Sequence, residues 1–254
     1  MCDSIAWENY LNQFDISYHH FQNIPSHTEK FCVIIEPRKH KYLLRVIKNF
    51  TYLLQTKGWG LIIFHGTENE NFLKQSLQNW NHVKYVNLQV TNLNIHQYNH
   101  ILTTVPFWNF LRRLGCKHSL LFQTDTVLLK DNVNDFLHYD FIGAPWCVEW
   151  YNIKGGYNGG LSLRNVEKMI DIIQKSHPLF FENTIVHVNE DIYFAYFMDK
   201  HRSECVLPEH DVAKQFSVET VYYSDPVGMH QPHVSKFPSE NDFERILSKR
   251  YEIE

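Results

Sequence analysis

Short apolar segments alternate with amphipathic segments between residues 31 and 129, and this alternation constrains the fold more than any other feature. The apolar segments have the length and composition of buried strands. Proline cannot donate to a β-ladder, so Pro37 predicts that the first strand ends at Glu36. The four predicted strands are FCVIIE (31–36), WGLIIFHG (59–66), HVKYVNLQV (82–90) and KHSLLFQTDTVLL (117–129).

Predicted helices connect these strands. Residues 40–58 carry apolar side chains at helical spacing and end in Gly58, which suits a helix C-terminus. Residues 68–80 predict a short helix, and residues 95–116 predict a helix that is interrupted or restarted near Pro106. Such alternation is typical of the α/β class, with a mostly parallel central sheet and helices on both faces.

The domain organisation follows from the same pattern. Residues 1–28 are polar and aromatic, and we expect an irregular N-terminal leader there. The chain has 254 residues, no internal repeat and no Gly/Ser linker, so residues 29–254 are expected to form one domain. Its C-terminal half is richer in loops and aromatic residues, which suits a region that shapes a substrate site.

Polar residues follow three of the predicted strands. Glu36-Pro37-Arg38 follows the first, His65-Gly66 ends the second, and Gln123-Thr124-Asp125 interrupts the fourth. Ligands of open α/β sheets bind beyond the carboxyl ends of the strands. We therefore expect these residues to meet at one edge of the sheet.

Asp125 is the most informative of them, because a lone carboxylate in so apolar a segment is costly to bury without a partner. A helix cap or a turn is one explanation. A metal ion is the other, since carboxylates suit Mg²⁺ and Mn²⁺, whose remaining ligands are often water and phosphate oxygens.

Three features of the second half could carry chemistry. The stretch KGGYNGGLSLRN (154–165) has two glycine pairs, which permit close approach of a ligand or form a flexible loop. Glu190 and Asp191 follow a potential N-cap, Asn189, where acids stabilise a helix by ~0.3–1 kcal/mol each or one of them acts as a general base. His230 is either a surface imidazole or a ligand for metal or phosphate.

Composition excludes several classes. The formal net charge is −4, which argues against nucleic acid or an anionic membrane surface as a partner. The five scattered cysteines form no CxxC pair, which favours reduced thiols and a cytoplasmic location. No segment has the pattern of a signal peptide or a membrane span, and neither a P-loop nor a GxGxxG motif is present.

Several ordered motifs resemble those of a nucleotide-sugar glycosyltransferase of the GT-A fold. More narrowly, they resemble a sparsely characterised GT-A-like family found in microbes, fungi and viruses. The resemblance extends over residues 31–237. The motifs are IIEPR, IFHG, LLFQTDTVLL, FIGAPW, NGGLSLRN, NEDIYF and GMHQPH.

The resemblance implies a role for each candidate residue. Gln123-Thr124-Asp125 corresponds to the Asp-X-Asp motif with Gln in place of the first acid, so Asp125 is the implied ligand of Mn²⁺ or Mg²⁺. His230 is implied on the metal or the diphosphate, and Asp191 with Glu190 beneath the acceptor. The implied donor-binding residues are Ile35, Glu36, Pro37, Arg38, His65, Gln123, Thr124, Gly159 and Gly160.

The function implied is sugar transfer from a nucleoside-diphosphate sugar, with UDP-sugar as the expected donor, to a hydroxyl of a glycan or glycoconjugate. The acidic pair favours an inverting reaction with Asp191 as the base. Loss of the first acid leaves metal dependence open. It also leaves open a non-catalytic module that binds nucleotide sugar or glycan. A metal-dependent hydrolase is a third hypothesis, although no HExxH spacing occurs.

Overall fold

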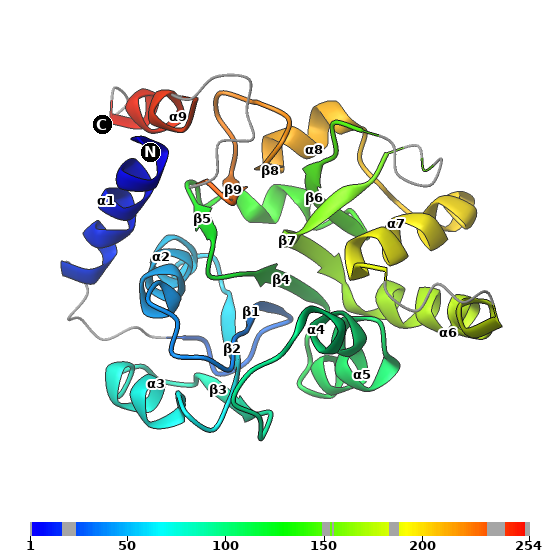
Figure 1. The fold of residues 1–254 in the computed structure, drawn as a ribbon, viewed down its shortest axis with the longest axis horizontal. Coiled ribbons are helices and arrows are strands. Elements are labelled where there is room, and N and C mark those ends of the chain that lie inside the picture. The colour runs from blue at the N-terminus through cyan, green and yellow to red at the C-terminus, as the bar shows by residue number, and fades with distance from the viewer. Residues whose placement is uncertain are drawn as a thin grey trace.

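The computed structural model describes residues 2–16, 24–148, 153, 155–182, 188–232 and 242–251. Their central feature is a six-stranded sheet with the strand order β3-β2-β1-β4-β7-β6 (Figure 1). The strands are β1 (Lys30–Ile35), β2 (Gly60–His65), β3 (Lys84–Asn87), β4 (His118–Phe122), β6 (Phe141–Pro145) and β7 (Tyr157–Asn165).

The sheet has a parallel part and an antiparallel part. The strands β3, β2, β1 and β4 run parallel, and β4 also pairs with β7, which is antiparallel to both β4 and β6. The parallel strands read as near-continuous apolar runs because both faces are covered, and Val33, Ile34, Ile62 and Ile63 are fully buried. The predicted α/β class is therefore confirmed.

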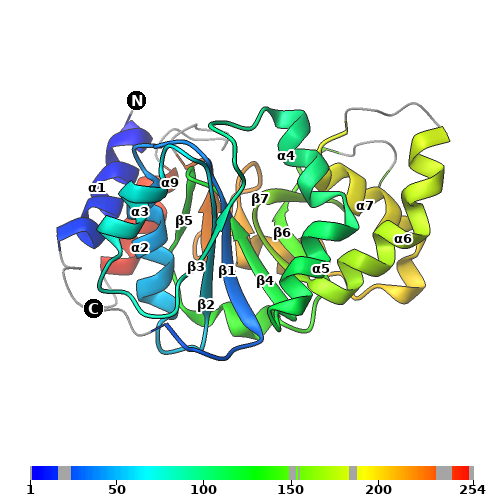
Figure 2. The ribbon, with the colours of Figure 1, turned by 90° about the horizontal axis from the view of Figure 1, so that it is seen from below.

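Helices cover both faces of the sheet (Figure 2). One face carries α1 (Cys2–Ile16), α2 (Leu43–Leu54), α3 (Glu70–Ser76) and α9 (Asp242–Tyr251). The other carries α4 (Ile95–Leu102), α5 (Val105–Arg113), α6 (Val166–Glu182) and α7 (Glu190–Lys200). Two short 3₁₀ helices (Asn132–Phe136 and Arg202–Glu204) and α8 (His210–Phe216) complete the described helices.

The fourth predicted strand is divided in two. It leaves the central sheet after Phe122 and resumes as β5 (Thr126–Leu128) in a second sheet of order β5-β9-β8, with β8 at Ser217–Val218 and β9 at Gly228–His230. The polar residues 123–125 form the crossing between the two sheets. This break leaves Asp125 partly exposed, whereas Phe122 before it and Val127 after it stay buried.

The irregular structure expected for residues 1–28 is wrong for residues 2–16, which form α1; residues 17–23 lie outside the described part of the chain. The cause is an apolar stripe at positions 7, 11 and 14, where Trp7, Leu11 and Phe14 are buried. The Tyr10 hydroxyl also donates to the carbonyl of Leu128 in β5 (3.2 Å). Whether residue 28 is a domain boundary stays a prediction.

A flexible loop was one interpretation of the glycine-rich stretch, and the structure differs from it. Gly159 and Gly160 lie inside β7, which spans Tyr157–Asn165. Both glycines allow side chains from other elements to approach the strand. A Cβ on Gly159 would lie 2.0 Å from Glu190 Oε1, and one on Gly160 would lie 2.3 Å from His230 Nε2.

Within the described ranges, no helix combines the length and the apolar character needed to cross a bilayer.

The burial of Trp7 predicts that α1 is an integral part of the domain. Trp7→Ala is expected to lower the free energy of unfolding by about 3–5 kcal/mol, because a buried indole leaves a cavity beside the ring of Tyr42. Ile5→Ala, at an exposed position of the same helix, should change it by less than about 0.5 kcal/mol. Urea denaturation of both variants measures the difference, and equal effects would contradict the packing of α1.

Candidate functional site

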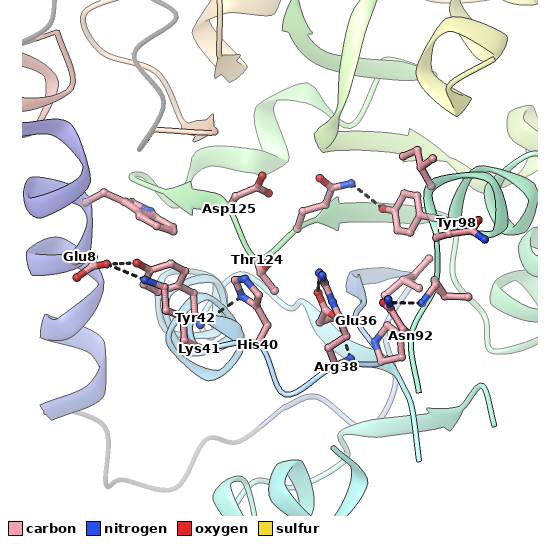
Figure 3. A pocket seen from close by; sticks show the side chains of 17 residues that line it. Glu8, Glu36, Arg38, His40, Lys41, Tyr42, Asn92, Tyr98, Thr124 and Asp125 are labelled. Carbon is pink, nitrogen blue, oxygen red and sulfur yellow. Dashed lines mark hydrogen bonds and ion pairs between the residues drawn. The ribbon is translucent and has the colours of Figure 1, made fainter. Parts of the chain in front are cut away.

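A cavity of about 610 Å³ lies beyond the carboxyl ends of the neighbouring strands β1 and β4 (Figure 3). This is the edge at which α/β sheets bind their ligands. Three further segments complete the wall, from α1, from the start of α2 and from the N-terminus of α4. The lining residues are Trp7, Glu8, Ile35, Glu36, Pro37, Arg38, His40, Lys41, Tyr42, Asn92, Leu93, Asn94, Ile95, Tyr98, Gln123, Thr124 and Asp125.

The structure therefore brings together seven of the predicted residues in this cavity: Ile35, Glu36, Pro37, Arg38, Gln123, Thr124 and Asp125. His65 on β2, which was predicted to bind the nucleotide-sugar donor, does not line the cavity. Its ring is buried and its Nδ1 lies 2.9 Å from the carbonyl oxygen of Gly66. The next residue, Gly66, packs closely against Pro37, which does line the cavity.

Glu36 and Arg38 form a tight turn after β1. The carboxylate of Glu36 accepts hydrogen bonds from the backbone N, Nε and Nη2 of Arg38 at 2.7–2.9 Å, and this contact raises the pKa of the guanidinium. The side chain of Arg38 remains half-exposed toward the cavity. Asn69, a residue that sequence reasoning missed, stabilises the turn by donating to the carbonyls of Glu36 (2.8 Å) and Arg38 (2.9 Å).

The wall contributed by α1 was not predicted either. Glu8 accepts a hydrogen bond from the hydroxyl of Tyr42. It also forms an ion pair with Lys41 Nζ at 3.3 Å. The Trp7 ring packs edge-on against Tyr42, with 4.3 Å between the ring centroids. The helical spacing of apolar residues in α1 was the signal that could have found this wall.

Asp125 lies beside a buried histidine. Pairing of β5 with β9 sets Thr126 opposite His230, and the amide of Gln231 donates to the carbonyl of Asp125 (2.7 Å). His230 Nε2 is then 3.6 Å from Asp125 Oδ1, and Nδ1 is 3.5 Å from Glu219 Oε1. Burial alone would lower the pKa of His230, but the two carboxylates outweigh it and raise the pKa to about 9.

This cluster could hold a metal ion through two protein ligands. Both ring nitrogens of His230 are buried and have no hydrogen-bond partner among the described residues. A carboxylate with an imidazole suits Mn²⁺, and Mg²⁺ often takes only one or two carboxylates with phosphate oxygens. In the described part of the chain, however, no three His, Cys, Asp or Glu side chains converge on one point that could hold a metal.

Glu190, one of the two predicted acids, lies in a buried ion pair. Its carboxylate is buried and receives two hydrogen bonds from the guanidinium of Arg164, from Nη1 at 2.5 Å and from Nη2 at 2.9 Å. Arg164, on β7, is itself fully buried among the aromatic rings of Trp108, Phe141 and Phe194. A carboxylate held in this way cannot take a proton from a substrate without losing its partner, so we interpret Glu190 as a structural residue.

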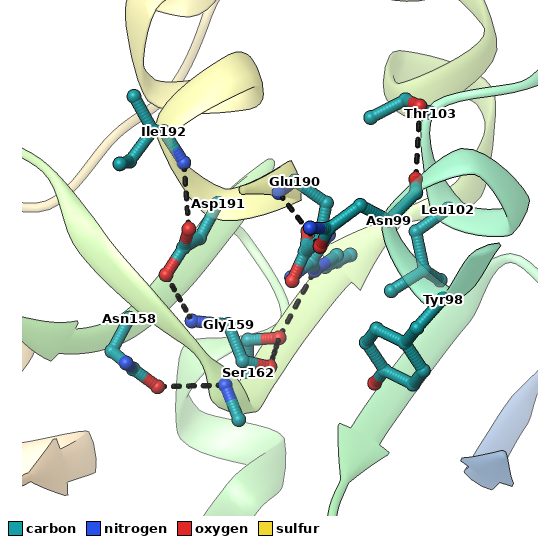
Figure 4. Close-up of polar contacts among 12 residues, drawn as sticks. Tyr98, Asn99, Leu102, Thr103, Asn158, Gly159, Ser162, Glu190, Asp191 and Ile192 are labelled. Atoms are coloured by element: carbon teal, nitrogen blue, oxygen red, sulfur yellow. Dashed lines mark hydrogen bonds and ion pairs between the residues drawn. The ribbon is translucent and has the colours of Figure 1, made fainter. Parts of the chain in front are cut away.

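Asp191, the next residue, is partly buried, and Figure 4 shows its carboxylate between the amides of Ile192 and Gly159. Its Oδ1 accepts from the amide of Ile192 (2.8 Å) and its Oδ2 from the amide of Gly159 (3.3 Å). Burial raises the pKa of Asp191 to about 6, and the negative charge of Glu190 adds to the rise. A carboxylate with a pKa in this range is suited to general-base chemistry near neutral pH.

The first turn of α7 is held by α4. Asn189 has the extended backbone of an N-cap but its side chain makes no capping hydrogen bond. Instead Asn99 accepts from the amide of Glu190 (3.2 Å) and donates to Asn189 Oδ1 (3.2 Å). The residue before Asn99 is Tyr98, which lines the cavity. One turn of α4 thus connects the cavity wall to the turn that carries Asp191.

Residues 82–230 match the model of a family described as "Protein of unknown function (DUF5672)". This chain belongs to that family. The DUF5672 match includes Asp125, Asp191 and His230, but the part of the cavity wall formed by α1 and by residues 35–42 lies outside it.

Comparison with individual proteins adds little to the family assignment. No curated protein matches the chain. Among solved structures, the apo-form glycosyltransferase GlyE of Streptococcus pneumoniae TIGR4 is similar with a TM-score of 0.48 and 13% identity. The likeness covers 89% of this chain and only 64% of that one, and it is too weak to decide fold or function.

The buried ion pair between Arg164 and Glu190 predicts a large loss of stability when one partner is removed. Glu190→Ala should lower the free energy of unfolding by about 3–5 kcal/mol, because the guanidinium of Arg164 stays buried without its counter-charge. Glu167→Ala removes the exposed partner of Arg112 and should cost less than about 1 kcal/mol. Chemical denaturation of the two variants tests this, and similar losses would show that the buried pair is not a structural requirement.

Proposed function

We propose that this protein transfers a sugar from a nucleoside-diphosphate sugar to an acceptor hydroxyl. The observation that carries the proposal is a cavity at the carboxyl ends of β1 and β4 that is lined by both Asp125 and Arg38. The adjoining helix α7 carries Asp191, a carboxylate whose pKa is raised. The motifs that resemble a GT-A glycosyltransferase supply several of these residues.

The cavity suits an anionic nucleotide. Its volume of about 610 Å³ lies within the range of small-molecule sites. The side chains of Arg38, His40 and Lys41 line it and can contact phosphate oxygens. We assign the diphosphate to the region between Arg38 and Asp125.

The charge beneath the diphosphate comes from the pair Asp125 and His230. These two residues would hold Mn²⁺ or Mg²⁺, which when bound offsets the charge that develops on the leaving diphosphate. Without an ion, His230 itself carries a proton at neutral pH, since its pKa is raised to about 9. Both arrangements supply a positive charge next to Asp125.

Asp191 is the proposed general base of an inverting transfer. In its deprotonated form it accepts the proton of the acceptor hydroxyl as that oxygen attacks the anomeric carbon, while the bond to the diphosphate breaks. Arg164 and Glu190 fix the first turn of α7 and so orient Asp191. UDP is the expected nucleotide, and a glycan or glycoconjugate is the expected acceptor.

A binding module without catalysis is the second candidate. The observation that favours it is the absence of a three-ligand metal cluster among the described residues, together with Gln123 at the position of the first acid. Such a module would bind the donor and release no nucleoside diphosphate.

The donor site predicts stabilisation by nucleotide sugars. At about 100 times its Kd, a ligand adds about 2.7 kcal/mol to the free energy of unfolding, which raises the melting temperature by several degrees. Melting curves with UDP-, GDP- and dTDP-sugars, each with and without Mn²⁺, should show such a rise for one nucleotide. Asp125→Ala should reduce the rise, whereas Asp135→Ala, at an exposed position, should leave it unchanged.

Each outcome of this experiment is informative. A rise that Mn²⁺ enlarges only when Asp125 is present supports the metal site. A rise that ignores Mn²⁺ keeps the donor site and rejects the metal. No rise with any nucleotide sugar would contradict the proposed function.

The role of Asp191 predicts both a loss of turnover and a characteristic pH dependence. Asp191→Asn should lower the transfer rate by about 10²–10⁴-fold and leave donor binding intact. In the wild type, activity should rise with pH through about 6, because the base must be deprotonated and its pKa is raised to about 6. Asp199→Asn, near the other end of α7, is the matched control. Full activity of Asp191→Asn, or a pH profile flat across this range, would reject Asp191 as the base.

A further inference from the structure

A hydrogen-bonded pair of polar side chains in the cavity has no part in the chemistry described so far. Gln123 Nε2 donates to the hydroxyl of Tyr98 at 3.1 Å (Figure 3). Gln123 is the first residue after β4 and Tyr98 lies on α4, so the contact joins two elements that are 25 residues apart. Both side chains line the cavity.

The pair lies between the two ends of the proposed reaction. On one side Asp125, two residues after Gln123, lines the same cavity. On the other side Asn99 connects α4 to Glu190, the neighbour of Asp191, and Tyr98 appears beside this acidic turn in Figure 4. Burial raises the pKa of the Tyr98 hydroxyl, and the negative charges of Glu190 and Asp125 add to the rise. We therefore expect a sugar placed between the diphosphate and Asp191 to lie next to Tyr98.

The chemistry of the pair matches a sugar hydroxyl. With Nε2 of Gln123 donating to Tyr98, the Tyr98 O–H remains as a donor and the Gln123 Oε1 remains as an acceptor. Rotation of the amide by 180° reverses the contact and again leaves one donor and one acceptor, now the Gln123 NH₂ and the Tyr98 oxygen. A hydroxyl group needs both. An ionised aspartate at position 123 could accept hydrogen bonds but could not donate one.

We propose that Tyr98 and Gln123 together bind one hydroxyl of the donor sugar and thereby select nucleoside-diphosphate hexoses that carry this hydroxyl over deoxy sugars that lack it. The inference rests on the proposed function and deepens it, because it names the residues that recognise the transferred sugar. It also gives a reason for Gln at the first position of the Asp-X-Asp-like motif.

Binding measurements on Tyr98→Phe test the inference. The probes are UDP-, GDP- and dTDP-glucose, the matching nucleoside diphosphates, and monodeoxy analogues of the glucose donor that binds. Tyr98→Phe should weaken binding of the nucleotide glucose about 3–10-fold, the effect of one neutral hydrogen bond, and leave the nucleoside diphosphate unchanged. Tyr196→Phe, whose ring lies over Lys200 on α7, is the matched control and should change neither.

The deoxy analogues separate recognition from a merely structural effect. One analogue should bind the wild type 3–10-fold more weakly than the parent donor, and Tyr98→Phe should bind that analogue and the parent about equally. Gln123→Met, which keeps the shape and removes the polar groups, should behave like Tyr98→Phe and serves if the latter does not fold.

The failures of the two proposals are distinguishable. If the wild type binds none of the nucleotides or nucleotide sugars, the proposed function fails and this inference fails with it. If the wild type binds the donor but both variants discriminate among the deoxy analogues as the wild type does, the donor site stands and the role of Tyr98 and Gln123 is rejected. Equal weakening of the sugar-free nucleotide would also reject it.

Discussion

The pairing of β4 on both edges is the constraint on which the rest of the structure depends. One edge of β4 runs parallel to β1 and the other runs antiparallel to β7, so its backbone hydrogen bonds fix three strands in register. At its carboxyl end the chain must leave this sheet, and residues 123–125 cross to β5 in the second sheet. The cavity lies beside this crossing, and Gln123, Thr124 and Asp125 form part of its wall. The same pairing with β7 aligns Gly159 and Gly160 beside the crossing, where α7 and β9 approach.

Buried charge is concentrated around this crossing. Arg164 and Glu190 form a buried bidentate pair, and His230 lies between the carboxylates of Asp125 and Glu219. Replacing a buried ion pair by apolar side chains is often neutral or stabilising, so such pairs are poor explanations of stability. Here the geometry offers another explanation. A bidentate guanidinium–carboxylate contact has one favourable orientation, and it holds the first turn of α7 against β7, which orients Asp191 toward the amide of Gly159.

Much of the fold could be predicted from local patterns, whereas the site could be predicted only in part. The apolar runs at β1, β2 and β4 and the helical spacing of α2 report burial directly, because side-chain direction repeats with a fixed period in each element. The strand-end residues Ile35 to Arg38 and Gln123 to Asp125 follow from the rule that ligands bind where parallel strands end. Asn69 and Tyr98 carry no such signal, because their partners lie more than 20 residues away along the chain. Glu219 carries none either, because its contact with His230 depends on how β9 packs. The local pattern likewise placed Glu190 and Asp191 together and could not tell the paired carboxylate from the half-exposed one.

The sequence by itself determined the α/β class, the order of most elements and the edge of the sheet at which polar residues gather, since these depend on periodicity and on proline and glycine at strand and helix ends. Only the tertiary structure decided which of the polar residues meet. Packing of α1 on Tyr42 closed one wall of the cavity, pairing of β5 with β9 brought His230 to Asp125, and Arg164 paired with Glu190 in the interior. The physical reason is that hydrogen bonds and ion pairs act over a few ångströms in space, so their partners are set by how helices and sheets pack and not by their separation along the chain.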